Sequence, residues 1–185
     1  NTVKRCSRKD KTDMSTADKN KAHNRRFQIK GLIYDQHSTT INAMRFGVKP
    51  MSYNGCGLIA VYNALILLRR PDTLQNIADY YERHGRWIMG LWGIRPDRIT
   101  DFLKLKGFNI ENTNYLEAKS GIYIILVWNK KGGGLHYMAA RKYPSGMVEV
   151  YNGYVKRNGC DVYTGFGEFF DTTPITGVKL WRIYA

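Results

Sequence analysis

The sequence feature that most constrains the fold is an apolar run that begins directly after a cysteine. Residues 58–68 contain one amide, that of Asn63, and otherwise only Ala, Val, Ile, Leu and Tyr. A run of this length without Pro or Gly predicts a helix that is buried over most of its surface. Because Cys56 stands between Gly55 and Gly57, we expect its sulfur at the N-terminus of that helix, where backbone can approach closely.

Cys56 has two interpretations. A free cysteine is often a small, buried core residue without chemical function. Alternatively, the dipole of the helix and the free N–H groups of its first turn stabilise a thiolate, which is the nucleophilic form of cysteine. The second interpretation predicts a lowered pKa for the Cys56 thiol.

A histidine and an asparagine in the second half of the chain favour the nucleophile. His136 follows glycines at 132–134 and opens a strand-like run, and a second run after the turn at 144–146 ends at Asn152. Histidine titrates near neutrality, so it can take a thiol proton and return it to a leaving group. Asn152 would hold the far ring nitrogen, as the third member of a triad does, although Asn152-Gly153 is also a turn signal.

The order of Cys56, His136 and Asn152, the last two sixteen positions apart, resembles the papain-like cysteine proteases. The helix after the cysteine looks more like the bacterial branch, similar to the bacteriocin-processing double-glycine peptidases, although those usually have aspartate as the third residue. The resemblance covers residues 50–185. It implies an α+β papain-like fold, with helices packed on an antiparallel sheet, and a peptidase or amidase that acts on a peptide or protein without a cofactor.

One departure from this family concerns the oxyanion hole. Both branches usually carry a glutamine six residues before the cysteine, and this chain has Pro50 there. We expect Asn54 to supply the side-chain donor, together with the backbone N–H of Cys56; Gln36 and Asn42 are the alternative amides. The loss of such a donor typically costs about 100-fold or more in rate.

Four further residues are candidates for contacting a substrate. Trp87 and Trp92 enclose an apolar loop, which suits either a substrate groove or core packing. Lys130 and Lys131 precede His136 in a glycine-rich turn, where they would hold an acidic group or simply remain solvated.

The remaining histidines fit the role of base less well. His37 lies in the segment before the cysteine and is a second candidate base, whereas His23 lies in a basic segment and His84 at a predicted helix C-terminus. No two Cys or His residues have the spacing of metal ligands, so we expect neither a metal site nor a cofactor.

The charge distribution indicates an anionic partner. The net charge is +14, and residues 1–30 contribute half of it, with ten Lys or Arg and three Asp. Nucleic acid, a membrane surface or an acidic protein would suit this charge, and so would a solvated basic surface without a partner. We expect residues 1–30 to form a flexible basic arm or linker and residues 31–185 to form the catalytic domain.

The cysteine count and the chain start bear on the compartment. Cys6 and Cys160 could form a disulfide that leaves Cys56 free, or all three thiols could be reduced in a bacterial cytoplasm. We expect no membrane-spanning helix and no signal peptide. The chain begins at Asn1, so we expect a fragment that acts in the cytoplasm of a producing or target bacterium or is secreted within a larger protein.

The secondary structure follows from periodicity and breakers. We expect a packed segment or short strand over 31–34 and a loop over 35–55. The expected helices cover 56–70, then from Asp72 or Thr73 to Gly85, then from Pro96 to Gly107, and 166–170. The expected strands cover 122–128, 135–141, 147–151 and 178–184.

Two other functions are compatible with this sequence. A small basic domain that begins in mid-sequence resembles the C-terminal effector domains of bacterial polymorphic toxins, some of which cleave RNA such as tRNA, and this implies a cognate inhibitor or immunity protein. In that case His136 would act on the ribose 2′-OH. The third hypothesis is a catalytically dead papain-like module that binds an anionic partner.

Overall fold

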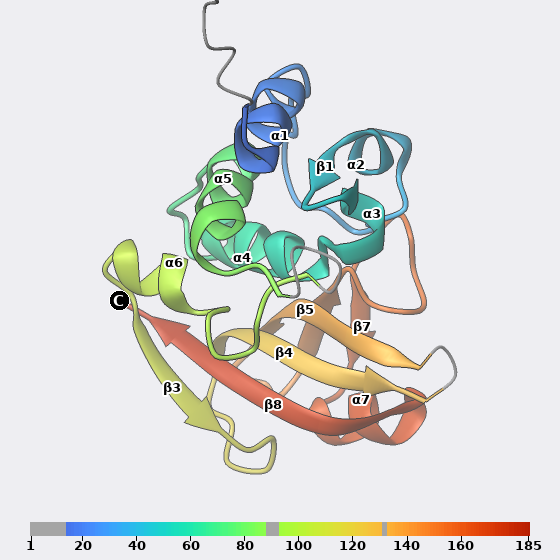
Figure 1. The fold of residues 1–185 in the computed structure, drawn as a ribbon. Helices are drawn as coiled ribbons and strands as arrows, with labels where there is room; N and C mark the ends of the chain where they lie inside the picture. The colour runs from blue at the N-terminus through green and yellow to red at the C-terminus, as the bar shows by residue number, and fades with distance from the viewer. Residues whose placement is uncertain (1–13, 88–92, 131–132) are drawn as a thin grey trace, which may run out of the picture.

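The computed structural model describes residues 14–87, 93–130 and 133–185. The α+β prediction is confirmed, because helices dominate the first half and one large sheet the second (Figure 1). The helices in these ranges are α1 (Thr16–Asn24), α2 (Thr39–Ala43), α3 (Met51–Asn54), α4 (Cys56–Leu67), α5 (Leu74–His84), α6 (Asp101–Leu105) and α7 (Phe166–Thr172). The strands are β1 (Arg45–Phe46), β2 (Lys49–Pro50), β3 (Asn109–Thr113), β4 (Gly121–Asn129), β5 (Gly134–Lys142), β6 (Val148–Tyr151), β7 (Asp161–Tyr163) and β8 (Ile175–Tyr184).

The main sheet is antiparallel throughout, with strand order β3-β8-β4-β5-β6-β7. The central strands β4 and β5 pair along their full length, and in that register Val127 lies opposite His136. His136 therefore lies on a central strand, near the end where the β4–β5 hairpin turns. The strands β1 and β2 form a separate small sheet.

Helices cover both faces of the main sheet. Figure 1 shows α4 and α5 on one face and α7 on the other. Alternate side chains of β4 enter two cores: Ile124 packs with the α4 side, whereas Tyr123 and Ile125 pack with α7. Because β4 is buried on both faces, its sequence is continuously apolar instead of alternating.

The buried helix predicted after Cys56 is confirmed as α4, although it ends at Leu67 and not at residue 70. Its one amide has a structural role. Asn63 accepts a hydrogen bond from the Ile33 N–H at 2.9 Å and donates one to the Ile33 carbonyl at 2.7 Å. The segment 31–34 is therefore a packed entry to the domain, which was one of its two expected forms.

The expectation of a flexible arm over residues 1–30 is wrong for residues 14–30. They include α1, which packs on α5 through polar contacts. Asn20 Nδ2 donates to the buried Glu82 at 2.5 Å, and ion pairs join Lys21 to Asp79 and Asp18 to Arg83, each at 2.7 Å. Cys6 and the rest of residues 1–13 lie outside the described residues.

Other elements differ in extent from the prediction. Residues 35–55 are not a loop, because they contain α2, β1, β2 and α3. The helix expected from Pro96 begins only at Asp101, after turns. Of the two predicted caps of α5, Asp72 and Thr73, the structure uses Thr73, which accepts from the Asn76 N–H. The predicted stop at Gly85 is confirmed. The strands β3 and β7 were not predicted.

Candidate active site

Cys56 is the first residue of α4, as predicted, and it is partly buried. The glycines beside it are required by close packing. A Cβ on Gly55 would collide with the Met51 carbonyl, and one on Gly57 would lie 3.1 Å from the side chain of Ile94. The helix start is therefore held tightly between α3 and the segment after residue 93.

The electrostatics of Cys56 differ from the prediction. The backbone N–H groups of Tyr137, Gly57 and Cys56 favour the thiolate and lower the thiol pKa, but burial outweighs them, so the pKa of Cys56 is raised. The lowered pKa that the helix N-terminus predicted for the Cys56 thiol is therefore not found, and the thiol is neutral at pH 7. Burial dominates because removing a charge from water disfavours the thiolate.

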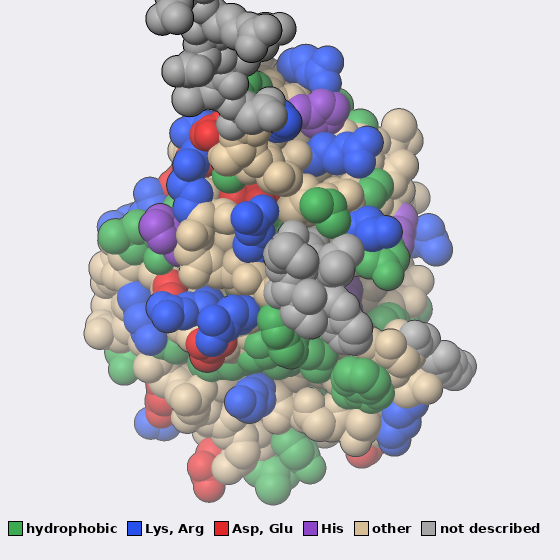
Figure 2. Space-filling model, viewed as in Figure 1, with side chains coloured by type: hydrophobic (Ala, Val, Ile, Leu, Met, Phe, Trp, Pro, Cys, Tyr) green, Lys and Arg blue, Asp and Glu red, His purple; other side chains and the backbone are tan. Residues whose placement is uncertain are grey.

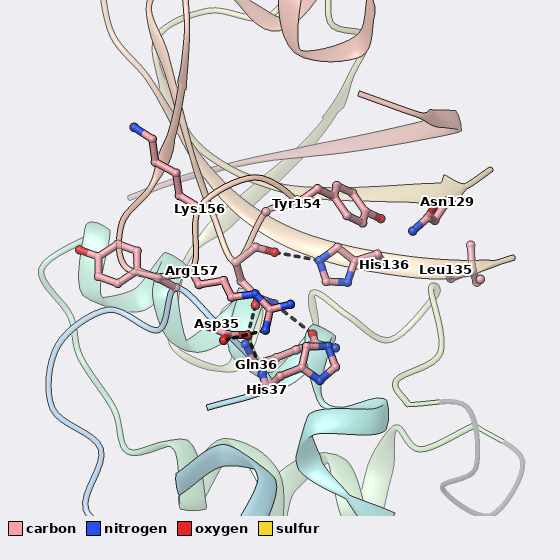
Figure 3. A pocket seen from close by; sticks show the side chains of 13 residues that line it. Asp35, Gln36, His37, Asn129, Leu135, His136, Tyr154, Lys156 and Arg157 are labelled. Atoms are coloured by element: carbon pink, nitrogen blue, oxygen red, sulfur yellow. Dashed lines mark hydrogen bonds and ion pairs between the residues drawn. The ribbon is translucent and has the colours of Figure 1, made fainter. Parts of the chain in front are cut away.

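His136 is held by the backbone and not by an asparagine side chain. Its Nε2 lies 2.8 Å from the carbonyl oxygen of Asn152 (Figure 3). A carbonyl only accepts, so this contact assigns the ring hydrogen to Nε2 and leaves Nδ1 as the basic nitrogen. Burial lowers the pKa of His136, the Asn152 carbonyl partly opposes this, and the charge of His37 lowers the pKa further. The ring is therefore neutral at pH 7.

The packing of α4 on β5 brings Cys56 close to the strand that carries His136. The backbone of Tyr137, the residue after His136, lies close enough to the Cys56 sulfur to lower the thiol pKa. Tyr154 lies near both residues. Its ring centroid is 5.0 Å from that of His136, and its pKa is raised mainly by burial and further by the charge of a Cys56 thiolate. Cys56 and His136 both belong to the described part of the chain, and no hydrogen bond joins the Cys56 thiol to the His136 imidazole.

The side chain of Asn152 contacts Gln36 and not His136, which corrects its predicted role. Asn152 Oδ1 accepts from the Gln36 N–H at 2.9 Å, and Asn152 Nδ2 donates to Gln36 Oε1 at 3.2 Å. Asn152 has a left-handed φ of 59°, which asparagine tolerates better than most residues. This conformation allows the Asn152 carbonyl to orient His136 while the Asn152 side chain binds Gln36.

The candidate oxyanion donors have structural partners. Asn54 is buried, and its Nδ2 donates to the Phe46 carbonyl at 3.0 Å. Asn42 Oδ1 accepts from the Ser52 hydroxyl at 2.6 Å. Gln36 Nε2 donates to the Ser52 carbonyl at 3.1 Å, and its side chain also lines the cavity described next.

A cavity of about 300 Å³ lies beside His136. Its walls include the segment 34–37, the start of β5, and the loop after Asn152 with Tyr154 and Arg157. Figure 3 shows that Arg157 reaches across toward Asp35, with which it forms an ion pair at 3.6 Å. His136 and His37, the second candidate base, both line this cavity. Sequence reasoning missed Tyr154 and Arg157, because no short motif marks them.

The other predicted contact residues lie elsewhere or are not described. Trp87 lines a separate cavity of about 320 Å³ with Arg95 and Asp97, and the exposed Lys130 is not part of the His136 cavity. Trp92 and Lys131 lie outside the described residues. Of the two that the structure describes, neither Trp87 nor Lys130 lines the His136 cavity.

Basic side chains do not gather into one stripe on the face shown in Figure 2. Lys and Arg are spread over it, with hydrophobic side chains between them. Cys56 and Cys160 are free thiols. In the described ranges, no three His, Cys, Asp or Glu residues are grouped as metal ligands, and no helix has the length and apolarity needed to cross a membrane.

Comparison of the chain with models of known protein families and with curated protein sequences gave no match.

Proposed function

We propose that this protein is a papain-like, cysteine-dependent hydrolase, either a peptidase or an amidase, with Cys56 as nucleophile and His136 as base. The observation that carries the proposal is the hydrogen bond from His136 Nε2 to the Asn152 carbonyl. It fixes the tautomer whose free nitrogen is basic. The next residue on the same strand, Tyr137, lies close enough to Cys56 for its backbone to lower the thiol pKa. A nucleophile, its base and an orienting group are the parts that covalent hydrolysis needs.

The reaction would start from a neutral pair. As the Cys56 sulfur attacks the substrate carbonyl, His136 Nδ1 takes the thiol proton, so no stable thiolate is required. The C–N bond then breaks, and His136 returns the proton to the departing amine, leaving a thioester. Water attacks the thioester with His136 again as base, and releases the acid and the Cys56 thiol.

The oxyanion would be held by the backbone N–H of Cys56 and by one side-chain amide. Asn54 remains the proposed donor, because it lies two residues before Cys56. Gln36 is the alternative, because it lines the cavity beside His136. Substitution of the true donor should lower kcat by about 100-fold or more.

The experiment is digestion of an unstructured protein and of a mixed peptide library, followed by mass spectrometry of the products. We expect wild type to cleave, and Cys56→Ala and His136→Ala each to abolish cleavage. Cys160→Ser, which removes the other described thiol, is the matched control and should retain activity. Cleavage by Cys56→Ala would contradict a thiol mechanism.

A second candidate is metal-independent cleavage of RNA. It is favoured by one observation: His37 and His136 line the same cavity with Arg157. One histidine would deprotonate a ribose 2′-OH, the other would protonate the leaving oxygen, and Arg157 would bind the phosphate. Incubation with total tRNA tests this: cleavage should survive Cys56→Ala and be lost in His37→Ala and His136→Ala. If neither protein nor RNA is cleaved, the inactive binding module is favoured.

A further inference from the structure

The loop between β6 and β7 is organised around one buried carboxylate. Asp161 is 3% exposed and accepts three successive backbone hydrogen bonds. Its Oδ2 accepts from the N–H groups of Tyr154 at 3.1 Å and Val155 at 3.2 Å, and its Oδ1 accepts from that of Lys156 at 2.8 Å. Successive N–H groups that converge on one anion form a well-defined concave site.

The carboxylate is fixed to the sheet, and the loop is fixed to the carboxylate. Asp161 is the first residue of β7, where it pairs with Val150 of β6. Gly153 allows the close approach, because a Cβ at this position would collide with Asp161 Oδ2. In the described part of the chain no Lys or Arg forms an ion pair with Asp161, so the three N–H groups are its principal partners.

This loop carries the groups that hold His136. Asn152, directly before Gly153, supplies the carbonyl that accepts from His136 Nε2, and Tyr154 packs its ring against the imidazole. A shift of the loop would therefore move the acceptor that determines which ring nitrogen carries the hydrogen.

We propose that Asp161 is a positioning residue for His136: by binding the N–H groups of residues 154–156, it places the Asn152 carbonyl and fixes the Nε2–H tautomer. This effect on the ring does not depend on catalysis; the expected effect on rate rests on the proposed hydrolase function. Only an acceptor-only group satisfies three donors in this position. The amide of asparagine has the same shape but would direct an NH₂ group at one of the three N–H groups.

The test compares Asp161→Asn with Asp171→Asn, a matched change at an exposed carboxylate on α7. Nitrogen-15 NMR of His136, recorded in the Cys56→Ala background, reports the tautomer without any need for activity. We expect Nε2–H in the parent and in Asp171→Asn, and a mixture of tautomers with a changed His136 titration in Asp161→Asn. An unchanged tautomer and titration in folded Asp161→Asn would overturn the proposal.

Activity gives a separate result. If the protein is a hydrolase, Asp161→Asn should lower kcat by roughly 10- to 100-fold, with a smaller change in KM, as when a group that orients a functional histidine is removed. An inactive wild type would refute the hydrolase function, while the NMR result would still decide the positioning role.

A further variant covers the case in which Asp161→Asn does not fold. Gly153→Ala keeps the charge but forces the loop away from Asp161 Oδ2, so it should also mix the His136 tautomers. In the wild type, the amides of Tyr154, Val155 and Lys156 should exchange with solvent more slowly than those of other exposed loops. Unperturbed His136 in Gly153→Ala, or fast exchange of these amides, would contradict the proposal.

Discussion

At the scale of single residues, the site depends on two neutral groups whose pKa values are set by burial. Cys56 and His136 could be selected from the sequence, because their residue types and order predict a nucleophile and a base. The direction in which the pKa of the Cys56 thiol shifts could not be predicted, because the burial of the thiol depends on how α4 packs on β5. The role of Asn152 was also hidden: a sequence shows its side chain, but the structure uses its carbonyl on His136.

The lowered pKa of His136 predicts a specific dependence of stability on pH. In the unfolded chain this histidine has its ordinary pKa of 6.5, whereas in the folded protein it resists protonation. The unfolded state therefore binds more protons as the pH falls below 6.5, and the free energy of unfolding decreases. His136→Gln should lose less stability than wild type between pH 7 and pH 5 in urea titrations. An equal loss in both proteins would show that His136 is not responsible.

At the scale of elements, predictability follows the kind of contact each element makes. The strands β4, β5, β6 and β8 and the helices α4 and α5 bury apolar side chains, so hydrophobic periodicity or apolar runs reveal them. In contrast, α1 has no apolar face, and it is fixed by Asn20, Lys21 and Asp18 through polar contacts with α5. The edge strands β3 and β7 have only five and three residues, which leaves no long pattern to detect.

The packing of α1 can be tested at Asn20. Its amide bridges the Gly47 carbonyl, at 2.8 Å, and the buried Glu82. Because Asn20→Ala leaves a buried carboxylate with one partner fewer, it should lower the free energy of unfolding by about 1–3 kcal/mol. Asn158→Ala, at an exposed asparagine, should change it by less than about 0.5 kcal/mol. Equal unfolding curves for Asn20→Ala and wild type would mean that α1 does not support the domain.

At the scale of the whole molecule, the site lies where the helical half meets the sheet. Gln36 joins the two halves: it binds Asn152 through two hydrogen bonds and donates to the Ser52 carbonyl in α3, four residues before Cys56. The α+β class was predictable, because helices and strands separate along the sequence. The link between Gln36 and Asn152 was not predictable, because these residues are 116 positions apart and neither belongs to a recognisable motif.

A double-mutant cycle tests whether Gln36 and Asn152 act together. Gln36→Ala and Asn152→Ala should each lower the free energy of unfolding by about 1–2 kcal/mol, and the double variant should be less destabilised than the sum of both. Gln28→Ala, at an exposed glutamine, is the control for an amide lost without consequence. Additive effects of the two substitutions would show that the link does not couple the halves.

The central claim is that His136 activates Cys56, and alkylation of the thiol tests it most directly. Iodoacetamide labelling of Cys56 and Cys160 can be followed in the same sample by peptide mass spectrometry, so Cys160 serves as an internal control. At pH 7 we expect Cys56 in wild type to react about tenfold faster than Cys56 in His136→Gln, because His136 can take the thiol proton as the sulfur attacks the reagent. The rate at Cys160 should be unchanged. Equal rates at Cys56 in the two proteins would contradict the account.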